Sequence, residues 1–308
     1  MNRFKRCRLL SRLWLSFKKK FRRKPASRTI AISVLVLFLL FLFGIENIRS
    51  REQSAPGTLR VHAFSVGEAN AALIELPDGR TILIDAATEE QGERLAFLLK
   101  KQGIGTIDFL IGTHPHADHI GGIPRLLKTF SVHRLLLQDP FSGDRLTQEA
   151  CHLWGKTPEW LRAGTVLIRE PQLFLEVLSP SIHSNYEDEN TASAVIRLVC
   201  KGKIFLFMGD ATAQTETDLL KRGKSLKADY LLVAHHGSAT SSSPEFLSAA
   251  APEVAVISVG QENSHELPND LVVSRLSRIV SRLYRTDRDG TVTVVCEKDQ
   301  LRVYREKN

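Results

Sequence analysis

The stretch GTHPHADHIGG, residues 112–122, carries three histidines and one aspartate within six positions, namely His114, His116, Asp118 and His119. Neutral imidazoles and carboxylates bind zinc, manganese or iron without help from cysteine. Side chains two apart in an extended segment project to the same side, so His114 and His116 are expected to act together. Asp118 and His119 follow directly and can turn towards a second ion.

Other metal-competent side chains also come directly after apolar runs. FLFMG leads into Asp210, and LLVA leads into His235 and His236. In α/β sheets, the loops after the carboxyl ends of the strands converge on one crevice. With Asp210 able to bridge and His235 available, two ions about 3.5–4 Å apart are feasible, and such a pair activates water near neutral pH.

Simpler structural roles remain open for single members of this set. Asp210 would also serve as the N-cap of a helix that begins in ATAQTE. The HHGS segment, residues 235–238, would also form a turn that binds no metal.

The segments around these motifs favour an α/β fold. LRVHAFSV, NAALIEL and TILIDA read as strands, and PDGR at 77–80 predicts a hairpin between the last two. Further strands are predicted at 106–112, 133–138, 203–209, 229–234 and 253–260, and helices at 90–103, 213–223 and 244–250. Buried strands that alternate with helices are typical of a layered α/β architecture.

Charge is distributed unevenly along the chain. The formal net charge is +8, yet residues 1–28 hold twelve Lys/Arg and no acid, so the remaining 30 basic residues face 34 acidic ones, a balance of −4. Residues 29–45, TIAISVLVLFLLFLFGI, carry no charge and as a helix would extend roughly 25 Å.

This pattern predicts a basic cytoplasmic tail (1–28), a transmembrane anchor (29–45), a linker (46–58) and a domain (59–308) that lies outside the cytoplasmic membrane. The predicted partner of residues 29–45 is the lipid bilayer. A cleaved signal peptide and a buried core helix are the alternative interpretations of the apolar segment.

THPHADH resembles the HxHxDH signature of the metallo-β-lactamase superfamily. FSVGEANAALIEL, ENTASAVIRL, FLFMGDA, LLVAHHGSATSSS, AVISVGQEN and YRTDRDGTV, in this order, look like the extracellular nuclease domain of the ComEC/Rec2 competence proteins, over about residues 59–297. The resemblance implies a four-layer αββα sandwich. It also implies two divalent metal ions, zinc or manganese.

The resemblance also implies roles for individual residues. One ion would be held by His114 and His116, the other by Asp118, His119 and His235, with Asp210 as the bridge. Asp118, Asp210 and Ser238 would be the catalytic residues, and His236 would shape the pocket. Asp85, at the end of ILID, would orient a metal-bound histidine, with a plain turn residue as the alternative.

Three departures from the family pattern concern the site. Asn190 stands near the place where many superfamily hydrolases have another histidine, so the first metal position would be weak or completed by water. Ser65 and Asn70 replace acids in SVGEANA. NSHELP lacks a Gly-His-Pro element, and its His265 is displaced by two positions. These changes spare the expected ligands but bear on the substrate.

A row of arginines follows near the C-terminus. LVVSRLSRIVSRLYR, residues 271–285, predicts a helix with Arg275, Arg278 and Arg282 along one face. A solvated face is the simpler interpretation, and a groove for phosphates is the alternative.

Together these observations predict a membrane-anchored hydrolase that uses metal-activated water on phosphodiesters, with DNA or another phosphodiester as substrate. Hydrolysis of another ester or of a lactam, and a non-catalytic metal-binding role in assembly, are the alternatives.

Overall fold

The strands carry apolar side chains on both faces, and this decides their place in the fold. In the computed structural model, Ile82 and Ile84 of β3 (Thr81–Ile84) pack in one core cluster, while Leu83 packs in another. Successive side chains of a strand point to opposite faces, so such a strand has to be covered on both sides. The structure describes residues 57–138, 144–261, 263, 265–297 and 299–307.

Two mixed sheets account for the strands of this described part. The first has the order β15-β14-β1-β2-β3-β4-β5-β6, with antiparallel pairing from β15 to β3 and parallel pairing from β3 to β6. Its other strands are β1 (Leu59–Ala63), β2 (Ala72–Glu75), β4 (Thr106–Gly112), β5 (Ser131–Gln138), β6 (Glu159–Leu161), β14 (Val292–Glu297) and β15 (Gln300–Arg305). The predicted hairpin around residues 77–80 is confirmed as the β2–β3 pair.

The second sheet has the order β13-β12-β11-β10-β9-β8-β7. Pairing is parallel from β13 to β10 and antiparallel from β10 to β7. The strands are β7 (Val166–Glu170), β8 (Leu173–Ser179), β9 (Val195–Cys200), β10 (Lys203–Phe207), β11 (Tyr230–Leu232), β12 (Val254–Ile257) and β13 (Arg282–Arg285). Each sheet thus joins a parallel block to an antiparallel one.

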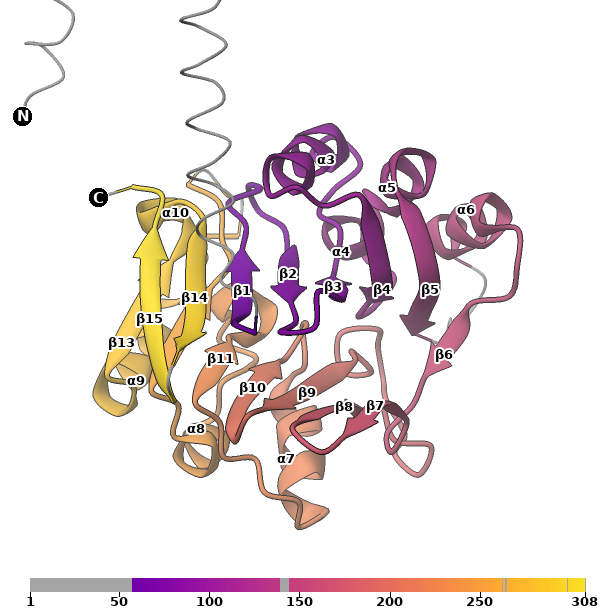
Figure 1. Cartoon of the computed structure of the whole chain (residues 1–308). Coiled ribbons are helices and arrows are strands. Elements are labelled where there is room, and N and C mark those ends of the chain that lie inside the picture. Colours follow the sequence, from indigo (N-terminus) through magenta and orange to yellow (C-terminus); the bar gives the residue numbers. More distant parts are fainter. Residues whose placement is uncertain (1–56, 139–143, 262, 264, 298, 308) are drawn as a thin grey trace, which may run out of the picture. The chain divides into compact units, whose positions relative to one another are not determined.

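Helices cover the outer face of each sheet, as Figure 1 shows. On the first sheet these are α3 (Gly92–Lys101), α4 (Ala117–Ile120), α5 (Ile123–Thr129) and α6 (Arg145–Trp154), and on the second α7 (Ala213–Lys221), α8 (Pro244–Ala250) and α9 (Asp270–Ile279). The short α10 (Thr286–Asp289) follows β13, and a 3-10 turn, η1 (Ala234–Gly237), follows β11. The expected layered α/β arrangement is therefore present, and the helices predicted at 90–103, 213–223 and 244–250 are confirmed.

The inner faces of the two sheets meet in an apolar core. Ile74 and Ile111 of the first sheet share this cluster with Ile196, Phe205 and Val256 of the second, all with no solvent exposure. Full burial of one such side chain contributes about 1.5–3 kcal/mol, so the contact between the sheets makes a large contribution to the stability of the fold. Helix faces and outer sheet faces enclose two further clusters.

Parallel strands from both sheets end at one edge and deliver the candidate site. The HxHxDH segment follows β4, and Asp85 follows β3 beside it. Asp210 follows β10, and the two histidines of η1 follow β11, its parallel neighbour. The predicted convergence of these strand ends is therefore present in the fold.

The predicted helix over residues 271–285 is wrong in its second half. Helix α9 ends at Ile279, and β13 begins at Arg282 and pairs in parallel with β12. Along β13, Leu283 packs towards the helices and Tyr284 towards the core between the sheets, which is the period of a strand. Leu271 and Ile279 are exposed, and Val272 and Leu276 are the buried residues of α9.

The predicted tail and anchor, with most of the linker, lie in residues 1–56, outside the described residues. Within the part of the chain that the structure describes, no helix has the length and apolar character needed to cross a bilayer.

We expect Gly122→Ala to destabilise the domain, because a Cβ on Gly122 would lie 2.0 Å from the backbone oxygen of Ala86. The turn between α4 and α5 would have to move away from the loop after β3, at a cost of about 1–3 kcal/mol. Chemical denaturation of the full chain measures the free energy of unfolding. Gly105→Ala is the control, since its Cβ would meet nothing within 4 Å. Equal stability of the two variants would contradict the expectation.

Candidate metal centre

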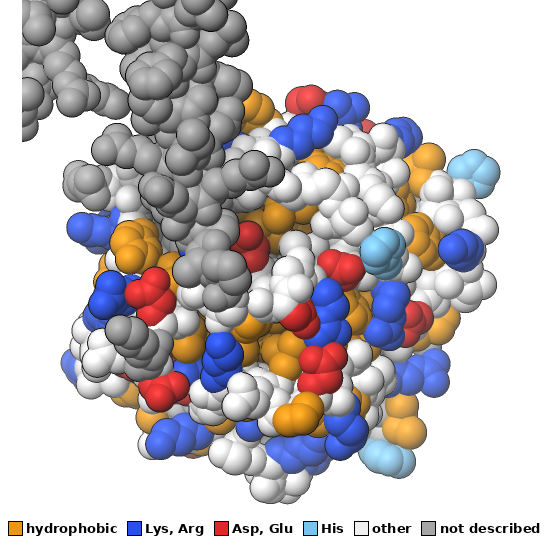
Figure 2. All heavy atoms as spheres, viewed as in Figure 1, with side chains coloured by type: hydrophobic (Ala, Val, Ile, Leu, Met, Phe, Trp, Pro, Cys, Tyr) orange, Lys and Arg blue, Asp and Glu red, His pale blue; other side chains and the backbone are white. Residues whose placement is uncertain are grey.

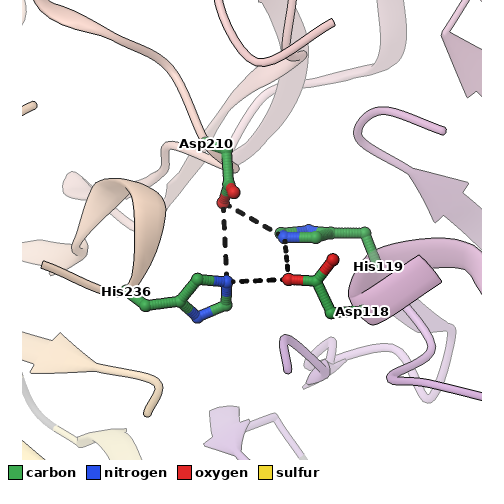
Figure 3. Close-up of side chains that lie close together, drawn as sticks. All are labelled: Asp118, His119, Asp210 and His236. Carbon is green, nitrogen blue, oxygen red and sulfur yellow. Dashed lines mark hydrogen bonds and ion pairs between the residues drawn. The ribbon is translucent and has the colours of Figure 1, made fainter. Parts of the chain in front are cut away.

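Four side chains from three segments converge at the strand ends, as Figure 3 shows: Asp118, His119, Asp210 and His236. One ligand atom from each lies within 4.8 Å of the other three. Nε2 of His119 lies 3.1 Å from Oδ1 of Asp210 and 3.4 Å from Oδ2 of Asp118. Nε2 of His236 lies 3.0 Å from the same Asp118 oxygen and 3.9 Å from Oδ1 of Asp210.

This donor set fits a divalent cation. Nε2 of His119 and Oδ1 of Asp210 are buried and have no hydrogen-bond partner in the protein. Such buried polar atoms cost free energy unless a partner satisfies them, and a cation would satisfy both. Two imidazoles and two carboxylates suit zinc and manganese alike.

Hydrogen bonds behind the cluster orient both imidazoles. Nδ1 of His119 donates to Oδ2 of Asp85 at 2.7 Å, and Nδ1 of His236 donates to the carbonyl of Ser258 at 2.9 Å. The backbone N–H and the hydroxyl of Thr113 hold Asp85 in turn, at 2.8 and 2.9 Å. Each histidine is thereby fixed with Nε2 towards the centre.

The carboxylates and imidazoles of the cluster shift the pKa values of one another. Burial opposes the ionised forms of Asp118 and Asp210, yet the nearby histidines hold the pKa of both carboxyls well below its usual value, mainly by hydrogen bonding at Asp118 and by charge at Asp210. Burial also opposes charge on His119, but the carboxylates of Asp210 and Asp85 raise its pKa well above the usual value. A cation therefore competes with the proton on His119, so metal affinity should weaken as the pH falls.

A second group of imidazoles surrounds the other oxygen of Asp210. Nε2 of His114 lies 3.7 Å from Oδ2, and Nε2 of His235 lies 3.6 Å from it. His114 is buried, and its Nε2 has no hydrogen-bond partner. Burial lowers the pKa of His114 and of His235, so both stay neutral and able to bind a metal. The ring of His116 stands against that of His114, with centroids 4.5 Å apart.

The geometry corrects the expected roles of the neighbouring histidines. His236, not His235, lies beside Asp118 and His119. Asp210 is not the N-cap of α7, which begins after Thr212. Its backbone N–H donates to Oγ of Ser193 at 3.0 Å, and its carboxylate points into the cluster.

The cluster forms part of the wall of an open cleft of about 630 Å³. The residues that line it are Glu68, Thr88, His116, Ala117, Asp118, Asp210, His235, His236, Ser238, His265 and Leu267. Ser238, predicted as a catalytic hydroxyl, lines this cleft, and its Oγ lies 3.0 Å from Oγ1 of Thr240. Asn190, near the place of the missing histidine, has a buried side-chain oxygen with no hydrogen-bond partner.

Arg275, Arg278 and Arg282, for which a phosphate groove was the alternative to a solvated face, are not among the residues that line this cleft. Arg282 on β13 pairs with Glu253 and donates to the carbonyl of Leu301 at 2.9 Å. Nη1 of Arg275 lies 3.5 Å from the carbonyl of Ser242, and Arg278 is exposed on α9. Two of the three arginines thus make contacts that hold the fold.

Sequence reasoning missed several residues that support or line the site. Thr113 directly precedes the histidine motif, and Ser193 lies within ENTASAVIRL, but spacing does not indicate either contact. Glu68 belongs to the altered SVGEANA segment and lines the cleft. The departure of this segment from the family pattern was visible in the sequence, whereas the position of Glu68 at the cleft was not.

The comparison with known families agrees with this geometry. The model of the metallo-β-lactamase superfamily matches residues 65–261. The chain belongs to the metallo-β-lactamase superfamily. The fold is similar to that of the β-hydroxylase CmlA (E377D mutant), with a TM-score of 0.54 at 14% identity, over 78% of this chain and 54% of that one.

Two relatives of this metallo-β-lactamase-fold chain cover most of its length. ComE operon protein 3 of Bacillus subtilis (strain 168) is 30% identical over 86% of this chain and 35% of its own length. Recombination protein 2 of Haemophilus influenzae (strain ATCC 51907 / DSM 11121 / KW20 / Rd) is 30% identical over 88% and 32%. The chain thus spans about a third of the length of these relatives, and the expected ComEC/Rec2 relationship is confirmed.

We expect Asp85→Asn to weaken metal binding by about 10–100-fold, because an amide oxygen orients His119 less firmly than a carboxylate does. Competition with a chromophoric chelator measures the dissociation constant. Asp108→Asn on the neighbouring strand β4 is the matched control, since Asp108 accepts hydrogen bonds from Thr81 and His133 outside the cleft. Unchanged metal affinity in Asp85→Asn would show that this carboxylate plays no part at the site.

Proposed function

We propose that this chain is a metal-dependent hydrolase that cleaves phosphodiester bonds. The observation that carries the proposal is the buried cluster of Asp118, His119, Asp210 and His236 at the wall of an open cleft. The cluster provides nitrogen and oxygen ligands, and the cleft admits a substrate to them. The relationship to the ComEC/Rec2 proteins favours a phosphodiester over other esters.

The residues at the cleft have separate roles in the proposed hydrolysis. When bound, divalent ions supply an activated water and neutralise negative charge on the scissile group. Asp210 presents one oxygen to each group of imidazoles and holds the two groups together. Asp118 is 30% exposed and forms the open side of the cluster. The Ser238 hydroxyl lines the cleft, where it can donate a hydrogen bond to a substrate oxygen.

The charges around the cleft favour recognition of a single scissile group over a long polyanion. Among its described lining residues there is no lysine or arginine, and Glu68 adds a carboxylate beyond those of the cluster. A protein that holds a nucleic acid along its backbone places lysine and arginine against successive phosphates. On the one face of the molecule that Figure 2 draws, basic and acidic side chains lie side by side. We therefore place a short or small phosphodiester ahead of duplex DNA.

The altered segments SVGEANA and NSHELP leave two other functions as alternatives. The ligand set alone does not distinguish a phosphodiester from another ester or a lactam. Asn70, a buried residue, stands where the family has an acid, and the replacement of that acid is the observation that favours a chain that binds metal without turnover. The activity assay distinguishes both alternatives from the proposed function.

The assay uses the full chain, purified in mild detergent and loaded with zinc or with manganese. Substrates are bis(p-nitrophenyl) phosphate, labelled single-stranded and duplex DNA, a p-nitrophenyl carboxylate ester and a chromogenic β-lactam. We expect phosphodiester cleavage, and we expect Asp118→Asn to lower kcat/KM at least about a thousandfold, since a metal ligand supports several kcal/mol of transition-state stabilisation.

Asp108→Asn is again the matched control and should keep the wild-type rate. Cleavage only of the carboxylate ester or the lactam would replace the proposed substrate class. Stoichiometric metal without turnover on any substrate would leave a binding role instead.

We further propose that residues 29–45 anchor the chain in the cytoplasmic membrane with the hydrolase domain outside the cytoplasm, on the strength of the basic residues 1–28. An alkaline phosphatase fused to the C-terminus should then be active in the native host. Replacing the twelve basic residues with glutamine should reduce that activity. The proposed topology would be contradicted if alkaline phosphatase fused to the C-terminus were inactive while a reporter that folds only in the cytoplasm were active at the same position.

A further inference from the structure

Glu68 stands on a loop that close backbone contacts hold at the cleft. The loop lies between β1 and β2, and the backbone N–H of Asn70 within it donates to the carbonyl of Asp118 at 3.0 Å. A Cβ on Gly260 would lie 2.8 Å from the backbone nitrogen of Glu68, so only glycine allows the two backbones to approach this closely. The Glu68 side chain, which lines the cleft, therefore extends from a backbone with a fixed position.

The carboxylate of Glu68 is partly buried but lacks a hydrogen-bond donor among the described residues. Its side chain is 26% exposed, and its ion-pair contact with Nε2 of His265 spans 3.9 Å, which is too long for a hydrogen bond. By contrast, Asp229, with a side chain that is 25% exposed, accepts hydrogen bonds from Lys203 and from the backbone N–H of Ile204 at 2.9 and 2.8 Å. A partly desolvated carboxylate is unfavourable without such donors, so a ligand that supplies them would be stabilised in the cleft.

The composition of the cleft wall indicates which donor fits. Among the described lining residues there is no lysine or arginine, and there is also no phenylalanine, tyrosine or tryptophan. A carboxylate without a cationic side chain beside it attracts a cation of the ligand. A primary ammonium group donates three hydrogen bonds, whereas quaternary ammonium groups are bound by aromatic cages. The wall therefore favours a primary ammonium group over a quaternary one.

We propose that the cleft binds phosphodiesters in which one esterified alcohol carries a primary ammonium group, and that Glu68 binds this group. The inference rests on the proposed function, which assigns the phosphate to the metal centre. A cleft of about 630 Å³ has room for a small ligand of this kind. The ammonium group compensates the Glu68 carboxylate, which repels a ligand that carries only phosphates.

Diesters that differ only at the end of a two-carbon alcohol test the proposal. The full chain, in mild detergent and loaded with zinc or with manganese, is assayed on the p-nitrophenyl phosphodiesters of ethanolamine, choline and ethylene glycol. Wild type should cleave the ethanolamine ester with a kcat/KM about 10–100-fold above that of the ethylene glycol ester, as one charge-assisted hydrogen bond predicts. The choline ester should gain less than about tenfold, because it donates no hydrogen bond.

Glu68→Gln should remove the preference, so that the ratio of the kcat/KM values for the ethanolamine and ethylene glycol esters falls to about 1. This ratio separates recognition from folding, because partial misfolding or loss of metal lowers both rates together. Glu266→Gln is the matched control. It removes an exposed carboxylate next to His265 that does not line the cleft, and it should keep the wild-type ratio.

Binding is measured separately, so that the preference is observed with or without turnover. Calorimetry compares the methylphosphonate esters of ethanolamine and ethylene glycol on the metal-loaded chain. Glycerophosphoethanolamine and phosphatidylethanolamine in detergent micelles then distinguish a soluble diester from a lipid headgroup as the source of the ammonium group. The one with the larger kcat/KM identifies the source.

The proposal is overturned if wild type prefers the ethanolamine esters neither in rate nor in binding. It is equally overturned if Glu68→Gln keeps the wild-type preference. A binding preference that Glu68→Gln removes, in a chain that cleaves no diester, would support this inference and refute the proposed function. Equal cleavage of all three diesters would support the proposed function and refute this inference.

Discussion

The site depends on one buried carboxylate, that of Asp210. It is 2% exposed, and imidazoles approach it from both sides: His119 and His236 at Oδ1, His114 and His235 at Oδ2. A desolvated charge of this kind is tolerated only where opposite charge or a cation compensates it. The surrounding histidines are therefore part of what allows the carboxylate to be buried, and a metal would complete the compensation.

The fold brings these groups together because each sheet combines a block of parallel strands with a block of antiparallel strands. The parallel blocks end at a common edge and carry the site, while the antiparallel blocks extend the apolar core between the sheets. Close backbone contacts fix the loops at that edge. A Cβ on Gly209 would lie 2.3 Å from Oγ of Ser193, the atom that accepts the N–H of Asp210. Glycine at 209, where φ is +52°, thus sets the position of the carboxylate.

The cleft and the charge distribution together indicate where positive charge for a substrate would come from. The excess of positive charge belongs to residues 1–28, and the remainder of the chain has a balance of −4. Arg275 does not line the cleft. It reaches the carbonyl of Ser242, in a loop whose backbone N–H groups at Ser242 and Ser243 donate to the buried Glu216 at 2.6 and 2.8 Å. Positive charge for a substrate would therefore come from bound metal rather than from side chains.

The sequence by itself determined the strands, the hairpin and the ligand-bearing segments, because apolar periodicity and turn residues act over a few positions. It also indicated that these segments meet, since the ends of parallel strands converge. Only the tertiary structure decided which histidine of the HHGS pair faces which oxygen of Asp210, because a left-handed turn sets that choice. The same holds for Arg282, whose segment pairs with β12 in place of continuing a helix. Both outcomes depend on contacts between distant segments, which local pattern does not encode.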